Sequence, residues 1–134
     1  MALALGAGAL TAIGGALLLA PSPEPDAATL RSLLPRSVTT PIAMGVAEPI
    51  DGEPSRTAAL VILTGIIGAL IADDLLSLLR VEEPAIRGFA MGLAAHGIGA
   101  ARALHLHAEA GAFATLGMIL NAVLTAALLP VLVN

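Results

Sequence analysis

Two short stretches place polar side chains beside helix-breaking residues in a chain that is otherwise strongly apolar. The first is Ser37–Ala47, where Thr39 and Thr40 directly precede Pro41. A proline suits the first turn of a helix and disfavours helical backbone in the residue before it. Thr40 is therefore predicted to cap a half-helix that begins at Pro41 and offers its free N–H groups and threonine hydroxyls to an anion. The alternative is a helix that begins after an interfacial loop and has no further role.

The second stretch brings His96, Gly97, Gly99 and Arg102 within seven residues. Paired glycines permit a break in a helix or a close helix crossing. Ionisable groups near membrane depth are costly and usually face the interior of a bundle. Arg102 is expected to pair bidentately with a carboxylate, either that of a substrate or that of Glu109. The alternatives are a histidine satisfied within the core and an arginine that reaches to the interface.

The remaining polar residues do not predict an enzyme. His105 and His107 are two positions apart and do not share a helix face, so interfacial histidines are favoured over a metal site. Asp73 and Asp74 lie beside the end of a predicted span, which favours a solvated boundary over a proton relay. No nucleophile–base pair and no set of metal ligands is apparent, so no catalytic residue, metal or cofactor is predicted.

The composition indicates an integral membrane protein. Hydrophobic residues make up 57% of the 134 residues, charged residues only 12%, and the mean hydropathy is +0.94. A soluble domain usually carries about 25% charged residues. The net charge of −4 comes with no basic run, which argues against nucleic-acid binding. The chain has no cysteine, so disulfides and thiolate metal sites are excluded.

The elements that must position the two stretches are predicted to be helices in one all-α membrane domain that covers 1–134. Loops are expected at 21–26, 48–56 and 80–87, with Pro84 opening the helix that follows. Asn121 and Thr125, four residues apart, share a face of the last span and are expected to hydrogen-bond across helices. The helical segments are three full spans at 1–20, 57–79 and 110–134, an interfacial helix at 27–35, and two broken or re-entrant segments at 37–47 and 88–101.

The first span has an alternative interpretation as a cleaved signal peptide. Such a peptide carries a charged region before its apolar core, but nothing charged precedes Glu24. A stretch of twenty uncharged residues also matches the length of a membrane helix. A true span is therefore favoured.

Three segments together resemble the LrgB/CidB family. They are LLPRSVTTPIAM (Leu33–Met44), AAHGIGAARAL (Ala94–Leu104) and EAGAFATLGMILNAVLTA (Glu109–Ala126), and their order and spacing also fit. The resemblance covers nearly the whole chain, but it is to the C-terminal part of the family pattern. Gly45 and the pair Asp73-Asp74 depart from that pattern, where an acidic or polar residue and Gly-Pro are expected, respectively.

The resemblance implies a multi-pass protein of the bacterial inner membrane. Family members are described as holin-like or antiholin-like regulators of murein hydrolase activity and autolysis that act by oligomeric assembly. Plant relatives resemble plastid carriers of glycolate and glycerate, and bacterial members are linked to small monocarboxylates such as pyruvate. The expected partners are the lipid bilayer, a small monocarboxylate, and either further copies of the chain or an LrgA/CidA-type membrane protein.

Both functions stay open, and the two broken segments favour a carrier of small organic anions. Their polar groups match a substrate with one carboxylate and one hydroxyl or keto oxygen. The predicted substrate-binding residues are Thr39, Thr40, Pro41, His96, Gly97, Gly99, Arg102 and Glu109.

Overall fold

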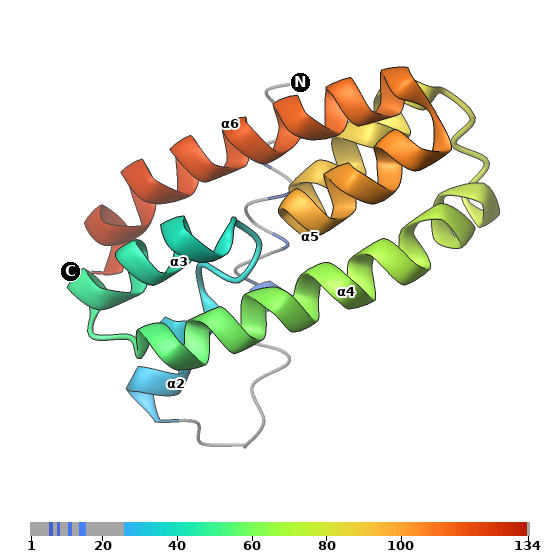
Figure 1. Ribbon diagram of the computed structural model, residues 1–134. Helices are drawn as coiled ribbons and strands as arrows, with labels where there is room; N and C mark the ends of the chain where they lie inside the picture. The colour runs from blue at the N-terminus through green and yellow to red at the C-terminus, as the bar shows by residue number, and fades with distance from the viewer. Residues whose placement is uncertain (1–5, 7, 9–10, 12–13, 16–25, 134) are drawn as a thin grey trace.

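The computed structural model describes residues 26–133 together with residues 6, 8, 11 and 14–15, and within these residues all the regular elements are helices (Figure 1). Two of its helices, α4 and α6, are long and apolar enough to cross a membrane. The predicted span at 1–20 lies almost wholly outside the described residues, so two of the three predicted spans are found. The helices are α2 (Ala27–Leu33), α3 (Thr40–Ala47), the short 3₁₀ helix η1 (Glu48–Ile50), α4 (Pro54–Leu78), α5 (Pro84–Leu106) and α6 (Ala108–Val133).

Helix α5 is broken in the middle, as predicted for the second stretch. Ala95 (φ −127°, ψ 16°) and His96 (φ 43°, ψ −131°) leave helical geometry, and His96 adopts a positive φ that is uncommon outside glycine. A Cβ on Gly99 would lie only 2.4 Å from the carbonyl oxygen of Met91. Residues eight apart in a straight helix are separated by about 12 Å. The two halves of α5 therefore fold back on each other as a helical hairpin, with both open ends at the same end of the molecule (Figure 1).

The stretch Ser37–Ala47 belongs to another re-entrant element, formed by α2, the turn after it and α3. This α2–α3 element reaches the middle of the molecule from the end opposite to the open ends of α5 (Figure 1). A turn after α2 leads to the middle of the molecule, and α3 runs back toward the end where α2 lies (Figure 1). With eight residues, α3 is about 12 Å long, too short to cross a bilayer. Pro41 lies in its first turn as predicted, but the cap is Thr39 rather than Thr40, and its side chain makes no capping hydrogen bond.

Small residues bring α5 and α6 into backbone contact. A Cβ on Gly88 would lie 1.9 Å from the carbonyl oxygen of Ala110, and one on Gly92 would lie 1.9 Å from that of Ala114. Gly88 and Gly92 are four residues apart, the spacing at which small residues allow helices to pack closely in membranes. The first half of α5 is thereby fixed along the first half of α6.

The helix boundaries differ from the predictions where local chemistry extends a helix. Helix α4 begins at Pro54, inside the predicted loop 48–56, because proline is preset for the first turn. Helix α5 begins at Pro84 as predicted, but it continues to Leu106, five residues beyond the predicted segment 88–101. Only His107 then separates α5 from α6, which begins two residues before the predicted span.

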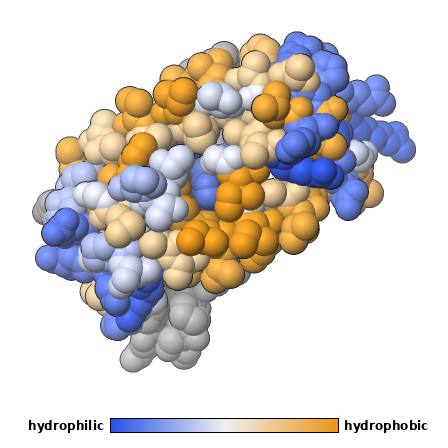
Figure 2. All heavy atoms as spheres, viewed as in Figure 1, coloured by the Kyte–Doolittle hydropathy of each residue, from blue (hydrophilic) through white to orange (hydrophobic). Residues whose placement is uncertain are grey.

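Hydrophilic side chains gather at two ends of the molecule, and apolar side chains occupy the band between them (Figure 2). At one end, Arg87 on α5 pairs with Asp73 on α4 at 2.5 Å and also bonds the carbonyl oxygen of Val81 at 2.7 Å. Asp73 is thus a boundary residue, as favoured from the sequence. The middle of α4 exposes a continuous set of large apolar side chains: Ile62, Leu63, Ile66, Ile67, Leu70 and Ile71.

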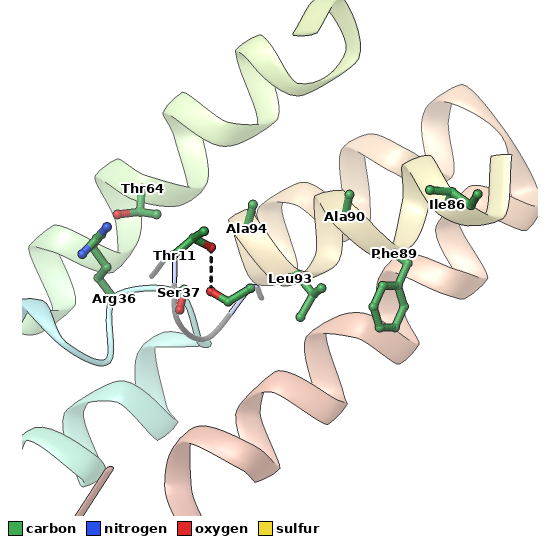
Figure 3. Close-up of a pocket in the computed structure, with 10 residues that line it drawn as sticks. Thr11, Arg36, Ser37, Thr64, Ile86, Phe89, Ala90, Leu93 and Ala94 are labelled. Carbon is green, nitrogen blue, oxygen red and sulfur yellow. Dashed lines mark hydrogen bonds between the residues drawn. The ribbon is translucent and has the colours of Figure 1, made fainter. Parts of the chain in front are cut away.

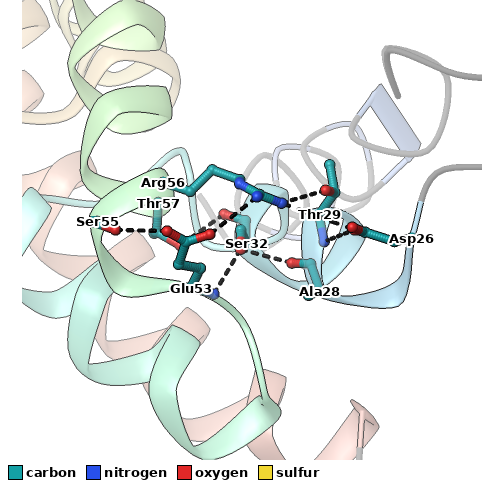
Figure 4. A network of polar contacts seen from close by, with 8 residues as sticks. All are labelled: Asp26, Ala28, Thr29, Ser32, Glu53, Ser55, Arg56 and Thr57. Atoms are coloured by element: carbon teal, nitrogen blue, oxygen red, sulfur yellow. Dashed lines mark hydrogen bonds and ion pairs between the residues drawn. The ribbon is translucent and has the colours of Figure 1, made fainter.

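A polar network at the other end ties α2 to the start of α4 (Figure 4). The buried hydroxyl of Ser32 accepts from the backbone N–H of Glu53 at 2.8 Å, and Thr57 donates to the carbonyl oxygen of Ser32 at 3.1 Å. Arg56 forms an ion pair with Glu53 and a hydrogen bond to Thr29. Hydrogen bonds from Thr29 also hold the pKa of Asp26, the α2 cap, below its ordinary value. This network therefore anchors the α2–α3 re-entrant element to α4 at the polar end of the molecule.

Candidate functional site

The two re-entrant elements meet at a single side chain near the midpoint of α6. The buried amide of Asn121 donates to the carbonyl oxygen of Ser37 at 3.1 Å and to that of Leu93 at 3.4 Å. Ser37 precedes α3, and Leu93 belongs to the first half of α5. The prediction that Asn121 bonds across helices is confirmed, whereas Thr125 has no such bond among the described residues.

His96 fixes the tip of the α5 hairpin to α4. Its Nε2 lies 2.9 Å from the carbonyl oxygen of Val61, so Nε2 carries the proton and donates it. The imidazole is 4% exposed and lies against Gly65, where a Cβ would come within 2.6 Å of the ring. This geometry fits the alternative of a core histidine with a satisfied hydrogen bond better than direct contact with a substrate.

A cavity of about 500 Å³ lies beside this meeting point (Figure 3). Its polar side chains gather at one end, and Ile86 and Phe89 of α5 lie at the other (Figure 3). Both Ser37 and Leu93, whose carbonyls Asn121 holds, line it. The lining residues are Gly8, Thr11, Arg36, Ser37, Thr64, Ile86, Phe89, Ala90, Leu93 and Ala94.

Arg36 is the cationic side chain at the polar end of this cavity. Its Nη1 is buried and has no hydrogen-bond partner within the part of the chain that the structure describes. Arg31, Arg56 and Arg87, by contrast, each pair with a carboxylate. A buried charge without a partner is costly, which makes such a group a candidate binding residue for an anion.

Arg36 was not among the site residues predicted from the sequence. A local signal existed, because Arg36 directly precedes the Ser37–Ala47 interruption. What the sequence could not supply is the turn between α2 and α3 that carries this residue inward. Backbone bonds from Arg36 to Leu33 at 3.3 Å and from Val38 to Pro35 at 3.2 Å form that turn.

The predicted site residues do not converge on this cavity. Thr39 lines a separate cavity of about 310 Å³ between α3 and α6. Thr40 is half-buried in the first turn of α3, and Pro41 is exposed. Gly97 is exposed at the start of the second half of α5, and Gly99 is buried in the hairpin contact.

Of the two carboxylate partners expected for Arg102, the structure does not place Glu109 within ion-pair distance. Both side chains are exposed at the polar end that holds the open ends of α5, and no ion pair joins them. Arg102 instead borders a third cavity, of about 540 Å³, beside Leu70 and His105. The α5 helix continues past Arg102 to Leu106, which carries its side chain out to the interface. Within the described residues, no group of three or more potential metal ligands occurs.

Comparisons with known proteins agree with the resemblance seen in the sequence. A protein from Bacillus subtilis, YwbG, is 42% identical over 103 residues, which are 77% of this chain and 46% of that protein. Holin-like protein CidB of Staphylococcus aureus is 39% identical over 102 residues, 76% of this chain and 44% of CidB. The chain thus spans less than half the length of these relatives. No solved structure matches it.

The holin-like relatives and the two long apolar helices together indicate a membrane protein. The model of the LrgB-like family matches residues 1–134, the whole of the sequence. The chain therefore belongs to the LrgB-like family.

Proposed function

We propose that this chain forms the substrate-binding part of a membrane carrier for small organic anions. The observation that supports this function is the meeting of two re-entrant helical elements, from opposite ends, at Asn121. Irregular backbone at membrane depth is tolerated where it is buried in protein or lines a cavity. Carriers build their substrate sites near the bilayer midplane from such discontinuous helices.

The geometry suits alternating access. The α5 hairpin reaches its tip from one end, and the α2–α3 element reaches the same depth from the other (Figure 1). A cavity between two such elements opens to one side when one element moves and to the other side when its counterpart moves. Transport would then require Asn121 and His96 to keep the tips of the α5 hairpin and the α2–α3 element at fixed positions along α4 and α6.

Uptake into proteoliposomes tests this proposal. Liposomes that contain the purified chain are expected to accumulate labelled pyruvate or glycolate with saturable kinetics, and unlabelled substrate should compete. Retention of a trapped fluorescent dye during the assay provides the control for leakage. Uptake that rises linearly with concentration, or that equals empty liposomes, would overturn the carrier proposal.

A second function is favoured by the names of the relatives, which support it more directly than they support a carrier. The Staphylococcus aureus and Staphylococcus epidermidis relatives are named holin-like protein CidB. By that analogy, the chain would act as a holin-like or antiholin-like regulator of murein hydrolase activity, assembled with further copies or with an LrgA/CidA-type membrane protein. The same liposomes separate the two functions, because a holin-like assembly releases trapped dye without saturation by any anion.

A further inference from the structure

The arginines of the described segments differ sharply in how their charge is balanced. Three are paired with carboxylates at the polar ends, and Arg80 and Arg102 are exposed. Arg36 alone, among those the structure describes, combines a buried guanidinium nitrogen with the absence of any partner. Buried ionised groups are normally paired or hydrogen-bonded. The fold therefore maintains an uncompensated positive charge at the wall of a cavity.

Besides Thr11, whose hydroxyl donates to the carbonyl oxygen of Gly8 at 3.0 Å, two further hydroxyl groups lie at the same end of that cavity (Figure 3). Ser37 follows Arg36 in the turn, and Thr64 comes from α4 (Figure 3). Within the described part of the chain, neither hydroxyl has a hydrogen-bond partner of its own. A guanidinium binds a carboxylate through two parallel N–H groups, and a neighbouring hydroxyl can donate to a further oxygen.

The rest of the cavity has a different character. Ile86, Phe89 and Leu93 line it from α5, so the walls away from Arg36 are apolar. No carboxylate and no second cation are among its lining residues in the described segments. One positive charge neutralises one negative charge, and a dianion would keep a second charge buried without a partner.

We propose that Arg36, with Ser37 and Thr64, binds the carboxylate of a small monoanion in this cavity, and that Arg102 does not take part. This assignment rests on the carrier function proposed above and names the residues of its site. The short carbon chain of the ligand lies toward Phe89, and the second oxygen function of a hydroxy or keto acid is within the reach of Ser37 or Thr64.

The experiment compares Arg36→Gln with the matched variant Arg102→Gln. Binding of pyruvate is measured calorimetrically in nanodiscs of phosphatidylcholine, with succinate as the dianion. Arg36→Gln is expected to weaken pyruvate binding about tenfold to hundredfold, the loss of a charge-assisted hydrogen bond pair. Arg102→Gln is expected to bind as the unchanged chain does, and succinate is expected to bind more weakly than pyruvate.

A second readout separates a binding role from a structural one. Because Arg36 has no internal partner, its replacement removes a buried charge without breaking a bond, so the empty Arg36→Gln protein should melt at a higher temperature than the unchanged chain. Lower thermal stability of the empty variant would overturn the proposal. Equal pyruvate binding by Arg36→Gln, or lost binding in Arg102→Gln, would do the same.

Anionic lipid offers the same chemistry as a free carboxylate, so one arm uses nanodiscs with added phosphatidylglycerol. Pyruvate binding that persists in these nanodiscs supports a soluble ligand. Binding of phosphatidylglycerol at Arg36, together with no binding of pyruvate, overturns the proposal. Calorimetric binding without uptake in liposomes would leave the site assignment in place and reject the carrier. Uptake that survives Arg36→Gln would reject the site and leave the carrier in place.

Discussion

At the scale of single residues, two polar side chains hold the breaks in the backbone. Asn121 reaches from α6 to the carbonyls of both re-entrant elements, and His96 reaches from the α5 tip to Val61 on α4. Backbone carbonyls that a break leaves without helical partners must be satisfied inside an apolar band. These two side chains therefore determine where the breaks sit relative to the long helices.

Replacing Asn121 should weaken the contact between the two re-entrant elements. Asn121→Ala removes the donor to Ser37 and Leu93, and the expected loss of stability is about 1 kcal/mol, typical of polar contacts between membrane helices. Thermal melting in detergent measures it. Thr115→Ala is the control on α6, because its hydroxyl bonds only Gly111 of the same helix. Equal melting temperatures for the two variants would contradict this role.

Gly65 should be required because the imidazole of His96 occupies the space beside it. A Cβ there would lie 2.6 Å from the ring, so Gly65→Ala should displace His96 from Val61 and cost about 1–3 kcal/mol. Gly45→Ala is the matched control, since a Cβ at Gly45 meets nothing within 4 Å.

The coupling between Gly65 and His96 can be measured directly. Adding His96→Ala to Gly65→Ala removes the clashing ring, so the two substitutions should cost less together than their sum. Strictly additive losses in thermal melting would show that the ring and the glycine act independently.

The sequence predicted some of these residues and missed others for a physical reason. Asn121 was predicted because an amide in an apolar span has few uses other than a bond between helices. Arg36 was missed because an arginine next to a loop ordinarily extends to water. Its inward position depends on the α2–α3 turn and on the network that anchors α2 to α4, both of which are tertiary features.

At the scale of elements, the breaks were predictable but their consequence was not. Pro41 and the glycines beside His96 mark both breaks locally. The reversal of α5 into a hairpin depends instead on contacts between residues far apart in sequence, such as Gly88 with Ala110 and Gly92 with Ala114. The break could be predicted from the sequence, but the direction that the chain takes after the break could not.

Gly92 should be essential for seating the α5 hairpin on α6. Gly92→Ala places a Cβ 1.9 Å from the carbonyl oxygen of Ala114, and a backbone atom in a helix cannot move aside as a side chain can. The expected cost is about 1–3 kcal/mol, read from thermal melting. Gly97→Ala is the control within the same hairpin, because its nearest neighbour would be the Sδ atom of Met118 at 3.9 Å. A larger loss for Gly97→Ala than for Gly92→Ala would contradict the close packing of α5 against α6.

At the scale of the whole molecule, the apolar band between two polar ends predicts how the helices cross the membrane. The α5 helix has 23 residues, which as a straight helix would measure about 34 Å and could cross a bilayer. The hairpin instead returns α5 to the end at which it began, whereas α4 and α6 run the full distance (Figure 1). The number of crossings therefore depends on whether α5 is folded back.

Single cysteines distinguish these topologies, and the chain has no native cysteine to interfere. Glu83→Cys and His107→Cys mark the two ends of α5, and Ser55→Cys marks the opposite end of α4. In sealed vesicles, a membrane-impermeant maleimide should label positions 83 and 107 from the same side and position 55 from the other. Detergent-opened vesicles, in which all three should react, provide the control. Labelling of positions 83 and 107 from opposite sides would mean that α5 crosses the bilayer, and the meeting of its tip with Ser37 at Asn121 would then not exist in the membrane.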